Sequence, residues 1–314
     1  MRKKQMKICL VIVILFIRSE SEAAATATTT TPAATVARDK RIIGGVEAAD
    51  SWHPYQAYLR RNGWSNKWFP GWFVSWYPTW FASDYCCGAS IISERYLLTA
   101  AHCVSVNVNV GDFEVVVGTN EIGDPYAWIY VAEYFAIHSD YERGGLPEND
   151  IAVIRVQGSI QFNDRVQPIR LPPADYEIPD ESLVTVTGWG SLQIEGGIKP
   201  SRLQMARMKV QNHEKCTDIW DSAYNEFLAN PYNMVSVIKD GMICLERTTA
   251  EQMCDGDSGS PVVDEDGYQI GIITFGGECG PYNDLPDVAM RITHYVDWIM
   301  ASMQILEFAQ VFTG

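Results

Sequence analysis

The segment Gly256-Asp257-Ser258-Gly259-Ser260-Pro261 lies near the C-terminal end of the 314-residue sequence. Glycine tolerates backbone angles that crowd other residues, so a serine between two glycines predicts a tight loop that presents one hydroxyl group. A hydroxyl is a weak nucleophile until a base takes its proton and a third group orients that base. The segment therefore directs attention to a histidine and a buried acid elsewhere in the chain.

Both partners precede the serine. His102 follows Thr-Ala-Ala and stands before a cysteine, and Asp150 opens the apolar segment Ile-Ala-Val-Ile. With these motifs in the order His, Asp, Ser, the sequence resembles the trypsin-like (chymotrypsin-fold) serine proteases over residues 42–299. The resemblance implies a catalytic triad of His102, Asp150 and Ser258, in which the serine attacks a peptide carbonyl and the histidine carries its proton.

Short β-rich runs make up most of the sequence. Runs such as 113–117, 129–131 and 183–186 are separated by Gly, Pro, Asn and Asp, and Asp-Glu-Asp-Gly at 264–267 predicts a hairpin turn. The resemblance implies an all-β fold of two six-stranded antiparallel β-barrels, with the active site in the cleft between them. Apolar positions spaced three and four apart predict a C-terminal α-helix over 294–308.

The beginning of the chain has the pattern of a leader. Basic residues at 2–7 precede an apolar run at 8–17 and small residues at 23–25, which is typical of a secretory signal peptide. Ten apolar residues are too few to cross a bilayer, which requires about 20, and no later segment is long enough. We therefore expect secretion to the extracellular space. The expected parts are a signal peptide (1–25), a flexible pro-segment (26–41) and a protease domain of two barrel halves (42–314).

The junction Arg41-Ile42-Ile43-Gly44-Gly45 suits cleavage by an activating protease. In the family that the sequence resembles, this cut frees an α-ammonium group that turns inward and pairs with the acid beside the nucleophile. Here those groups belong to Ile42 and Asp257. A buried charge must be paired, and breaking such a pair costs about 3–5 kcal/mol. The resemblance thus implies a zymogen that is switched on by cutting after Arg41.

Seven of the eight cysteines remain once the predicted signal peptide is removed. Secretion favours disulfides, but spacing alone does not give their connectivity. The resemblance implies three pairs, which are Cys87–Cys103, Cys216–Cys244 and Cys254–Cys279. These pairs leave Cys86 over, as a buried free thiol, a competitor of Cys87, or a link between two chains.

The resemblance also assigns groups around the reacting carbonyl. The backbone N–H groups of Gly256 and Ser258 would form the oxyanion hole, which holds the negative charge of the tetrahedral intermediate. Thr274 takes the place of a serine that hydrogen-bonds the buried acid, and its hydroxyl is expected to reach Asp150 in the same way.

The substrate pocket departs from the tryptic pattern. Trypsin-like members carry Asp at the pocket floor, where this chain has Gln252. Gly276, after Phe275, leaves one wall open, and Asp287 stands on the opposite wall. An acid on the wall is similar to the broad-specificity serine collagenases of arthropods. Two readings follow: Asp287 receives basic or polar side chains, or Gln252 and Asp287 bond each other and shorten the pocket. We do not expect strict tryptic specificity at P1, the substrate residue whose carbonyl is attacked.

An aromatic insertion sets this sequence apart from a compact family member. Between 64 and 81, five tryptophans recur every four residues, and prolines and a glycine argue against a regular helix. The insertion is either an aromatic platform for a substrate or partner, or a loop that packs on itself. The platform reading gives an alternative function, a non-catalytic binding homologue that acts through 64–81. A second long interval, between Cys216 and Cys244, contains a possible helix over 221–228.

Charge and composition limit the partners. Without residues 1–41 the chain keeps 16 basic and 36 acidic residues, a formal charge of −20. This balance argues against nucleic acid, whose binding rests on basic patches, and against anionic membrane surfaces. The sequence shows no ligand spacing for a metal, and we expect no cofactor. The expected partners are protein and peptide substrates, the activating protease and protein protease inhibitors, with the chain as a monomer.

Overall fold

The computed structural model describes ten parts of the chain. They are 45–49, 53–61, 85–105, 109–141, 147–191, 199–228, 236–247, 252–277, 279 and 284–313. The chain divides into two units, Met1–Asp39 and Lys40–Gly314, and all described residues belong to the second. The predicted signal peptide, pro-segment and cleavage junction, the insertion 64–81 and the Cys86 side chain lie outside the described residues.

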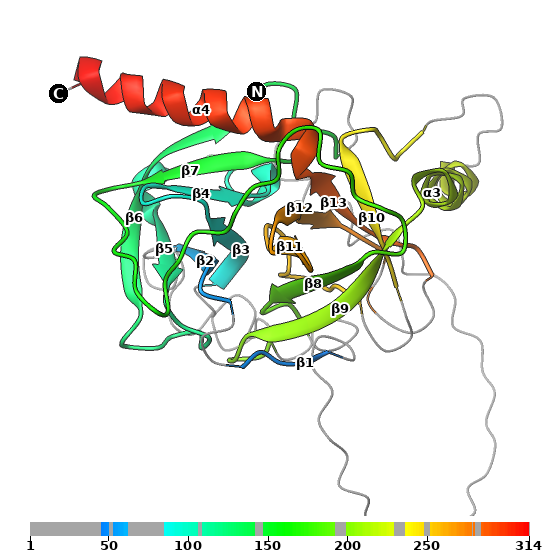
Figure 1. The fold of residues 1–314 in the computed structure, drawn as a ribbon, viewed down its shortest axis with the longest axis horizontal. Coiled ribbons are helices and arrows are strands. Elements are labelled where there is room, and N and C mark those ends of the chain that lie inside the picture. Colours follow the sequence, from blue (N-terminus) through cyan, green and yellow to red (C-terminus); the bar gives the residue numbers. More distant parts are fainter. Residues whose placement is uncertain are drawn as a thin grey trace, which may run out of the picture. The chain divides into compact units, whose positions relative to one another are not determined.

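The first barrel is a closed antiparallel sheet with the strand order β2-β3-β4-β7-β6-β5 (Figure 1). Its strands are nearly uniformly apolar on the inner side, and large side chains such as Leu97, Phe113 and Ile154 are fully buried in it. The strands are β2 (Gln56–Arg61), β3 (Tyr85–Ile91), β4 (Tyr96–Thr99), β5 (Phe113–Val117), β6 (Trp128–Ile137) and β7 (Ala152–Val156).

The second barrel closes in the order β9-β10-β13-β12-β11-β8, because β8 also pairs with β9. The short strand β1 (Val46–Glu47) pairs antiparallel with the first two residues of β9. The strands are β8 (Leu183–Gly188), β9 (Gln204–Gln211), β10 (Met242–Glu246), β11 (Pro261–Asp264), β12 (Gln269–Phe275) and β13 (Asp287–Arg291). The predicted all-β fold of two six-stranded antiparallel barrels is thus confirmed.

Alternating side chains explain why these segments form strands. In β9, Ala206, Met208 and Val210 are buried, whereas Arg207 and Lys209 between them are exposed. Successive side chains of a strand point to opposite faces, so this alternation buries one face in the barrel. The predicted hairpin turn is also confirmed: it joins β11 to β12, and Gly267 has a positive φ of 77° that favours glycine.

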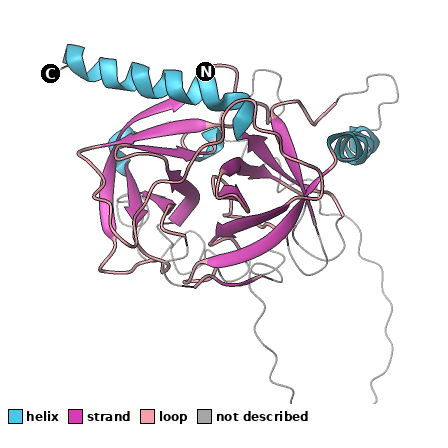
Figure 2. Ribbon diagram, viewed as in Figure 1, coloured by secondary structure: helices cyan, strands magenta, loops and turns pink. Residues whose placement is uncertain are grey.

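Two α-helices accompany the barrels, α3 (His213–Leu228) and α4 (Ile292–Thr313) (Figure 2). Both were expected from the sequence, but each begins earlier than predicted, and α4 also continues beyond residue 308. The helix α4 is tied to the first barrel by Arg155 of β7, which is fully buried and donates to the carbonyl of Leu306. The Tyr96 hydroxyl adds a hydrogen bond of 2.8 Å to Glu307.

Buried polar side chains join the two barrels. Ser90 of β3 donates to Gln269 of β12 at 2.7 Å, and Thr187 of β8 donates to Gln56 of β2, also at 2.7 Å. All four residues are buried. Buried polar groups are costly unless they are hydrogen-bonded, so these pairs favour one relative placement of the barrels. That placement fixes the loops that carry the candidate site.

Candidate active site

His102 and Asp150 extend from neighbouring strands of the first barrel. Strands β4 and β7 pair antiparallel, so the residues that follow β4 lie beside those that precede β7. His102 lies in the 3₁₀ turn Ala101–Cys103 after β4, and a disulfide joins Cys103 to Cys87 of β3. The strand register and the disulfide together hold the histidine beside the acid.

His102 contacts the Asp150 carboxylate at two points, one through its ring and one through its backbone. Nδ1 lies 2.7 Å from Oδ2, and the His102 backbone N–H donates to Oδ1 at 2.8 Å. An ionised carboxylate only accepts hydrogen bonds, so we assign the proton to Nδ1 and the lone pair to Nε2. The Asp150 side chain is 2% exposed and that of His102 is 36% exposed. An enclosed acid thus orients an imidazole that solvent and substrate can reach.

The loop of Ser258 comes from the second barrel and packs against the first. Gly256 and Gly259 have φ angles of 101° and 81°, which favour glycine, as the expected tight loop requires. The Ser258 carbonyl accepts a hydrogen bond of 2.9 Å from the Gly88 N–H. A Cβ at Gly259 would lie 2.3 Å from Gly88 O and from Thr99 Oγ1. The serine therefore lies on a loop that contacts β3 and β4, the strands that position His102.

The peptide group between Asp255 and Gly256 has a fixed orientation. The Asp255 carbonyl accepts a hydrogen bond of 2.8 Å from the Ser191 N–H. All described peptide bonds are trans, and in a trans peptide the N–H points opposite to the C=O. The Gly256 N–H therefore points away from Ser191.

Asp257, beside the serine, is a buried carboxylate that is 1% exposed. Its Oδ1 accepts from the Gly190 N–H at 2.8 Å, and its Oδ2 accepts from the Cys254 N–H at 3.1 Å. Burial raises the pKa of Asp257 to about 6, while these two N–H groups and the charge of Lys199 oppose the rise. The site thus makes the charged form of this carboxylate less favourable than it is in water.

Asp287 is held by a side chain that the sequence did not single out, Arg247. Arg247 Nε lies 3.1 Å from Asp287 Oδ1, and the two side chains are 3% and 1% exposed. The Met253 N–H donates to Oδ2 at 2.9 Å, and Arg247 Nη2 donates to the Met253 carbonyl at 3.1 Å. Neither reading of Asp287 from the sequence anticipated this closed arrangement. Gln252, at the expected pocket floor, is 1% exposed.

Strand pairing explains how Arg247 reaches Asp287. In the antiparallel pair of β10 and β13, Leu245 stands opposite Asp287. Arg247 follows two residues later and so lies beside the start of β13. Arg247 is one of several basic residues that could neutralise a buried Asp287. The register of β10 with β13 that brings these two residues together is not visible in one sequence.

Thr274 differs from the expectation. Its hydroxyl donates to the Ile272 carbonyl at 3.1 Å. A hydroxyl has one proton to donate, so this bond leaves none for the Asp150 carboxylate, which in its ionised form can only accept. The expected Thr274–Asp150 hydrogen bond is therefore corrected.

Phe275, a predicted pocket residue, packs edge-to-face on Trp220 of α3, with ring centroids 5.3 Å apart. The Trp220 Nε1 donates to the Pro286 carbonyl at 3.2 Å. Sequence reasoning placed a helix near Trp220 but gave this tryptophan no role. Trp220 thus contacts both Phe275 and the residue before Asp287, two of the segments expected to form the substrate pocket.

The three implied disulfides are present, with S–S distances of 2.05, 1.99 and 2.10 Å for Cys87–Cys103, Cys216–Cys244 and Cys254–Cys279. Among the described residues, the one grouping of metal-ligand types is Cys87, His102 and Cys103. Its two sulfurs are bonded to each other and are not thiolates, so this grouping is not a metal site.

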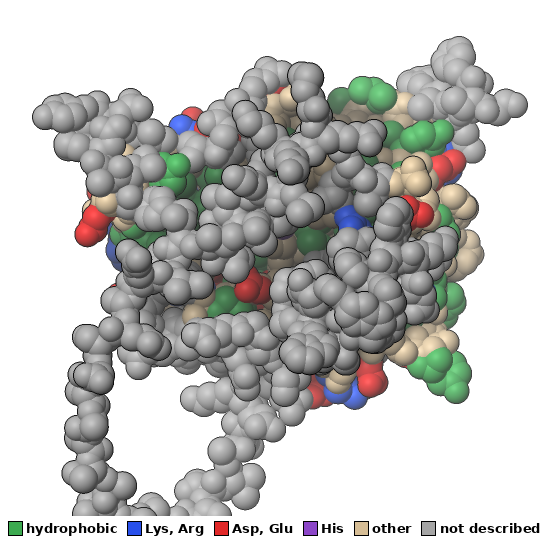
Figure 3. All heavy atoms as spheres, turned by 180° about the vertical axis from the view of Figure 1, so that it is seen from behind, with side chains coloured by type: hydrophobic (Ala, Val, Ile, Leu, Met, Phe, Trp, Pro, Cys, Tyr) green, Lys and Arg blue, Asp and Glu red, His purple; other side chains and the backbone are tan. Residues whose placement is uncertain are grey.

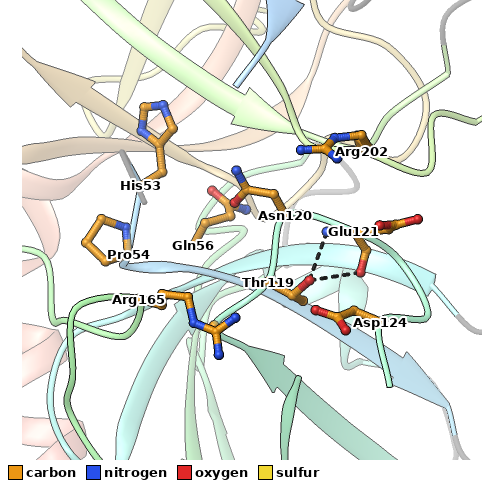
Figure 4. A pocket seen from close by; sticks show the side chains of 10 residues that line it. His53, Pro54, Gln56, Thr119, Asn120, Glu121, Asp124, Arg165 and Arg202 are labelled. Atoms are coloured by element: carbon orange, nitrogen blue, oxygen red, sulfur yellow. Dashed lines mark hydrogen bonds between the residues drawn. The ribbon is translucent and has the colours of Figure 1, made fainter. Parts of the chain in front are cut away.

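A cavity of about 270 Å³ lies elsewhere (Figure 4). Polar and charged side chains surround it, among them His53, Asn120, Arg165 and Arg202. None of the described residues predicted for the active site lines it. Arg202 is occupied by an ion pair with Glu47 at 2.5 Å. The cavity therefore adds nothing to the candidate site.

Charged side chains of both signs lie on the described surface. On the described part of the face in Figure 3, acidic and basic side chains are scattered among apolar ones. They form no continuous basic patch there, of the kind on which nucleic-acid binding relies. Within the described ranges, no helix combines the length and the apolar character that crossing a membrane requires.

Comparison with known proteins places this geometry in context. The profile of the Trypsin family matches residues 42–299. Brachyurin from Leptuca pugilator is 30% identical over 266 residues, which cover 84% of this chain and 99% of brachyurin. Transmembrane protease serine 11C from Mus musculus is 32% identical over 84% of this chain, and the match spans 54% of that relative.

A solved structure supports the fold. It is that of neuropsin, a serine protease expressed in the limbic system of mouse brain, with a TM-score of 0.64 and 25% sequence identity. The match covers 82% of this chain and 98% of the neuropsin chain.

Proposed function

Because the chain belongs to the trypsin family of serine endopeptidases, we propose that it is a secreted enzyme made as a zymogen, in which His102, Asp150 and Ser258 hydrolyse peptide bonds. The proposal includes a signal peptide over 1–25, a pro-segment over 26–41 and a protease domain over 42–314. The observation that carries it is the two-point contact between His102 and Asp150.

That contact explains the proposed proton transfers. With Nδ1–H turned to Asp150, the Nε2 lone pair of His102 is the acceptor for the Ser258 proton. The serine oxygen then bonds to the substrate carbonyl carbon, and the imidazolium returns its proton to the departing amine. Asp150, enclosed and held by two contacts, stabilises the imidazolium. In the second step His102 takes a proton from a water molecule, which attacks the acyl carbon. The serine oxygen leaves with that proton, and the carboxylic acid product is released.

The proposed oxyanion hole uses the Gly256 and Ser258 N–H groups. The Asp255 carbonyl bond to Ser191 supports this role for Gly256, since it turns the following N–H away from Ser191. Losing one such donor typically lowers the rate by about 10²–10³-fold.

Activation is proposed to follow a cut after Arg41. The Asp257 carboxylate accepts hydrogen bonds from the Gly190 and Cys254 N–H groups, and burial raises its pKa to about 6. An α-ammonium group from Ile42 would supply a full opposite charge and favour the ionised form. The gain from that pairing is what would stabilise the active arrangement of the loop.

The proposed P1 preference is not strictly tryptic, because Gln252 replaces an acid at the floor and Asp287 is engaged by Arg247. The proposed partners are protein and peptide substrates, a protease that cuts after Arg41 and protein protease inhibitors, with the enzyme as a monomer.

Labelling with an organophosphonate tests the catalytic proposal. The chain cut after Arg41 should be labelled covalently, and the label should be absent from a cut Ser258→Ala variant that is equally folded by circular dichroism. An unlabelled but folded, cut wild-type chain would support the binding homologue instead. An uncut Arg41→Gln chain should be secreted without activity; full activity in that variant would contradict the zymogen.

A further inference from the structure

We infer that Arg247 is a specificity-determining residue: its buried ion pair with Asp287 balances the charge of the carboxylate, so that the substrate pocket accepts uncharged P1 side chains. The inference rests on the proposed function and adds to it the chemical class of the substrate residue.

Each oxygen of the Asp287 carboxylate already has a partner inside the fold. Oδ1 of Asp287 faces Arg247 Nε at 3.1 Å, and Oδ2 accepts the Met253 N–H at 2.9 Å. Arg247 also donates to the Met253 carbonyl, so the guanidinium is held on two sides. Both charged side chains are at most 3% exposed. The ion pair is therefore part of the interior and is complete without a substrate.

The pair nevertheless lies against the expected pocket. A Cβ at Gly276 would be 2.2 Å from Asp287 Oδ1, so the carboxylate lies in the space beside Gly276 that was expected to be open to a substrate side chain. Met253, which contacts both members of the pair, follows Gln252 at the expected floor. The charge at this point would thus act on a bound P1 side chain at short range.

The electrostatic consequence depends on Arg247. With the guanidinium in place, the charge of Asp287 is balanced. A substrate Lys or Arg that approached Asp287 would also be repelled by the positive charge of Arg247. Without Arg247, a buried carboxylate lacks its counter-charge, which is strongly unfavourable. A cationic P1 side chain could then supply that charge. Arg247 therefore selects against the substrates that Asp287 alone would attract.

The experiment is a P1 library profile of four activated enzymes: wild type, Arg247→Met, Arg247→Met/Asp287→Asn, and the matched control Arg207→Met. Arg207 is an exposed arginine of β9, so its loss tests the effect of removing one surface charge. In the wild type, kcat/KM for Lys and Arg should be at least about tenfold below the best uncharged residue. Arg247→Met should raise the ratio of cationic to uncharged P1 turnover by about tenfold or more, and adding Asp287→Asn should abolish the gain.

Labelling each variant with the organophosphonate first separates the two proposals. If no variant is labelled, the proposed function fails and the inference falls with it. If the wild type is labelled and prefers Lys or Arg, or if Arg247→Met is labelled and keeps the wild-type profile, the inference is overturned. If Arg247→Met does not fold, the single variant Asp287→Asn is measured in its place. An unchanged low kcat/KM for P1 Lys and Arg supports the inference, and a fall in kcat/KM for these residues contradicts it.

Discussion

Two buried aspartates, Asp150 and Asp287, are each paired with a basic side chain, but the two pairs leave different groups open. Asp150 uses both oxygens on His102, whose ring remains about one third exposed. Asp287 divides its oxygens between Arg247 and a backbone N–H, and neither charged side chain reaches solvent. The first pair can exchange a proton with a substrate. The second can only set the field in which a substrate binds.

The comparison teaches that burial of the acid alone does not identify a catalytic carboxylate. What distinguishes the pairs is the partner: imidazole changes its charge near neutral pH, whereas guanidinium keeps it. A pair of the first kind is expected to matter most for rate, and a pair of the second kind for stability and specificity.

Asp150→Asn should have the largest effect, a loss of kcat. An amide can donate a hydrogen bond to the ring, which would move the proton from Nδ1 to Nε2 and leave no base for the serine. The expected loss in kcat is about 10⁴-fold. Steady-state kinetics on the cut enzyme measure it, with the unfolding midpoint as a check on the fold. A loss below tenfold would contradict the role of Asp150.

Arg247→Met should test the structural side. It leaves the Asp287 carboxyl buried without its counter-charge, and the free energy of unfolding should fall by about 3–5 kcal/mol at alkaline pH, where the acid is ionised. Because burial raises the pKa of Asp287 to about 7 even beside Arg247, the loss should shrink as the pH falls through neutrality and the acid is protonated. Urea unfolding of Ser258→Ala proteins, which cannot digest themselves, measures both effects. His102→Ala in the same background should change stability much less, because Asp150 keeps the backbone N–H of residue 102 and water can take the place of the partly exposed ring; equal losses would remove the distinction.

The pH dependence of the uncut chain adds a third buried acid to the comparison, Asp257. Its pKa is about 6 in the folded chain against 3.8 ordinarily, so between these pH values the folded state holds a proton that the unfolded state has released. The free energy of unfolding of the uncut chain should therefore fall as the pH rises from 4 to 6, by about 3 kcal/mol in total.

Cutting after Arg41 should remove this fall, because an α-ammonium partner lowers the pKa of Asp257. Uncut Asp257→Asn should lack it as well and serves as the control. Urea unfolding at several pH values, in the Ser258→Ala background, gives the comparison. Identical pH profiles for the cut and uncut chains would argue against the pairing of Ile42 with Asp257.

Thr274→Val should have the smallest effect. The hydroxyl donates to the Ile272 carbonyl and not to Asp150, so its loss should cost about 1 kcal/mol of stability and leave kcat within about threefold. Kinetics and unfolding of the one variant suffice. A fall in kcat of tenfold or more would show that Thr274 supports the catalytic acid after all.

The sequence was sufficient for features that local pattern or family resemblance specifies. Alternation along β9, the turn before Gly267 and the three disulfides were all expected, and the structure contains them. The pairing of His102 with Asp150 was implied by motifs whose spacing the family shares. These features depend on few residues close to each other or on strongly typed positions.

Other features depend on contacts that one sequence does not encode visibly. The role of Arg247 was missed because it depends on the register of β10 with β13, which brings Arg247 beside Asp287. One sequence does not show that register. The Thr274 bond was wrong because a single hydroxyl proton had two possible acceptors, and backbone geometry decides between them. The helix α3 began earlier than predicted because its start is marked by a cap, Asn212, whose Oδ1 accepts from the Lys215 N–H, and not by the apolar repeat.

The buried guanidinium of Arg155 has a consequence for biosynthesis. Its acceptor at Leu306 lies 151 residues further along the chain, whereas its nearer acid, Glu133 at 3.3 Å, belongs to β6 of the same barrel. The ribosome therefore completes the first barrel, and the acid that balances its interior cation, long before it delivers the helix that covers Arg155. We expect the barrel to close on the nascent chain while one side of this guanidinium stays in water until the last helix emerges.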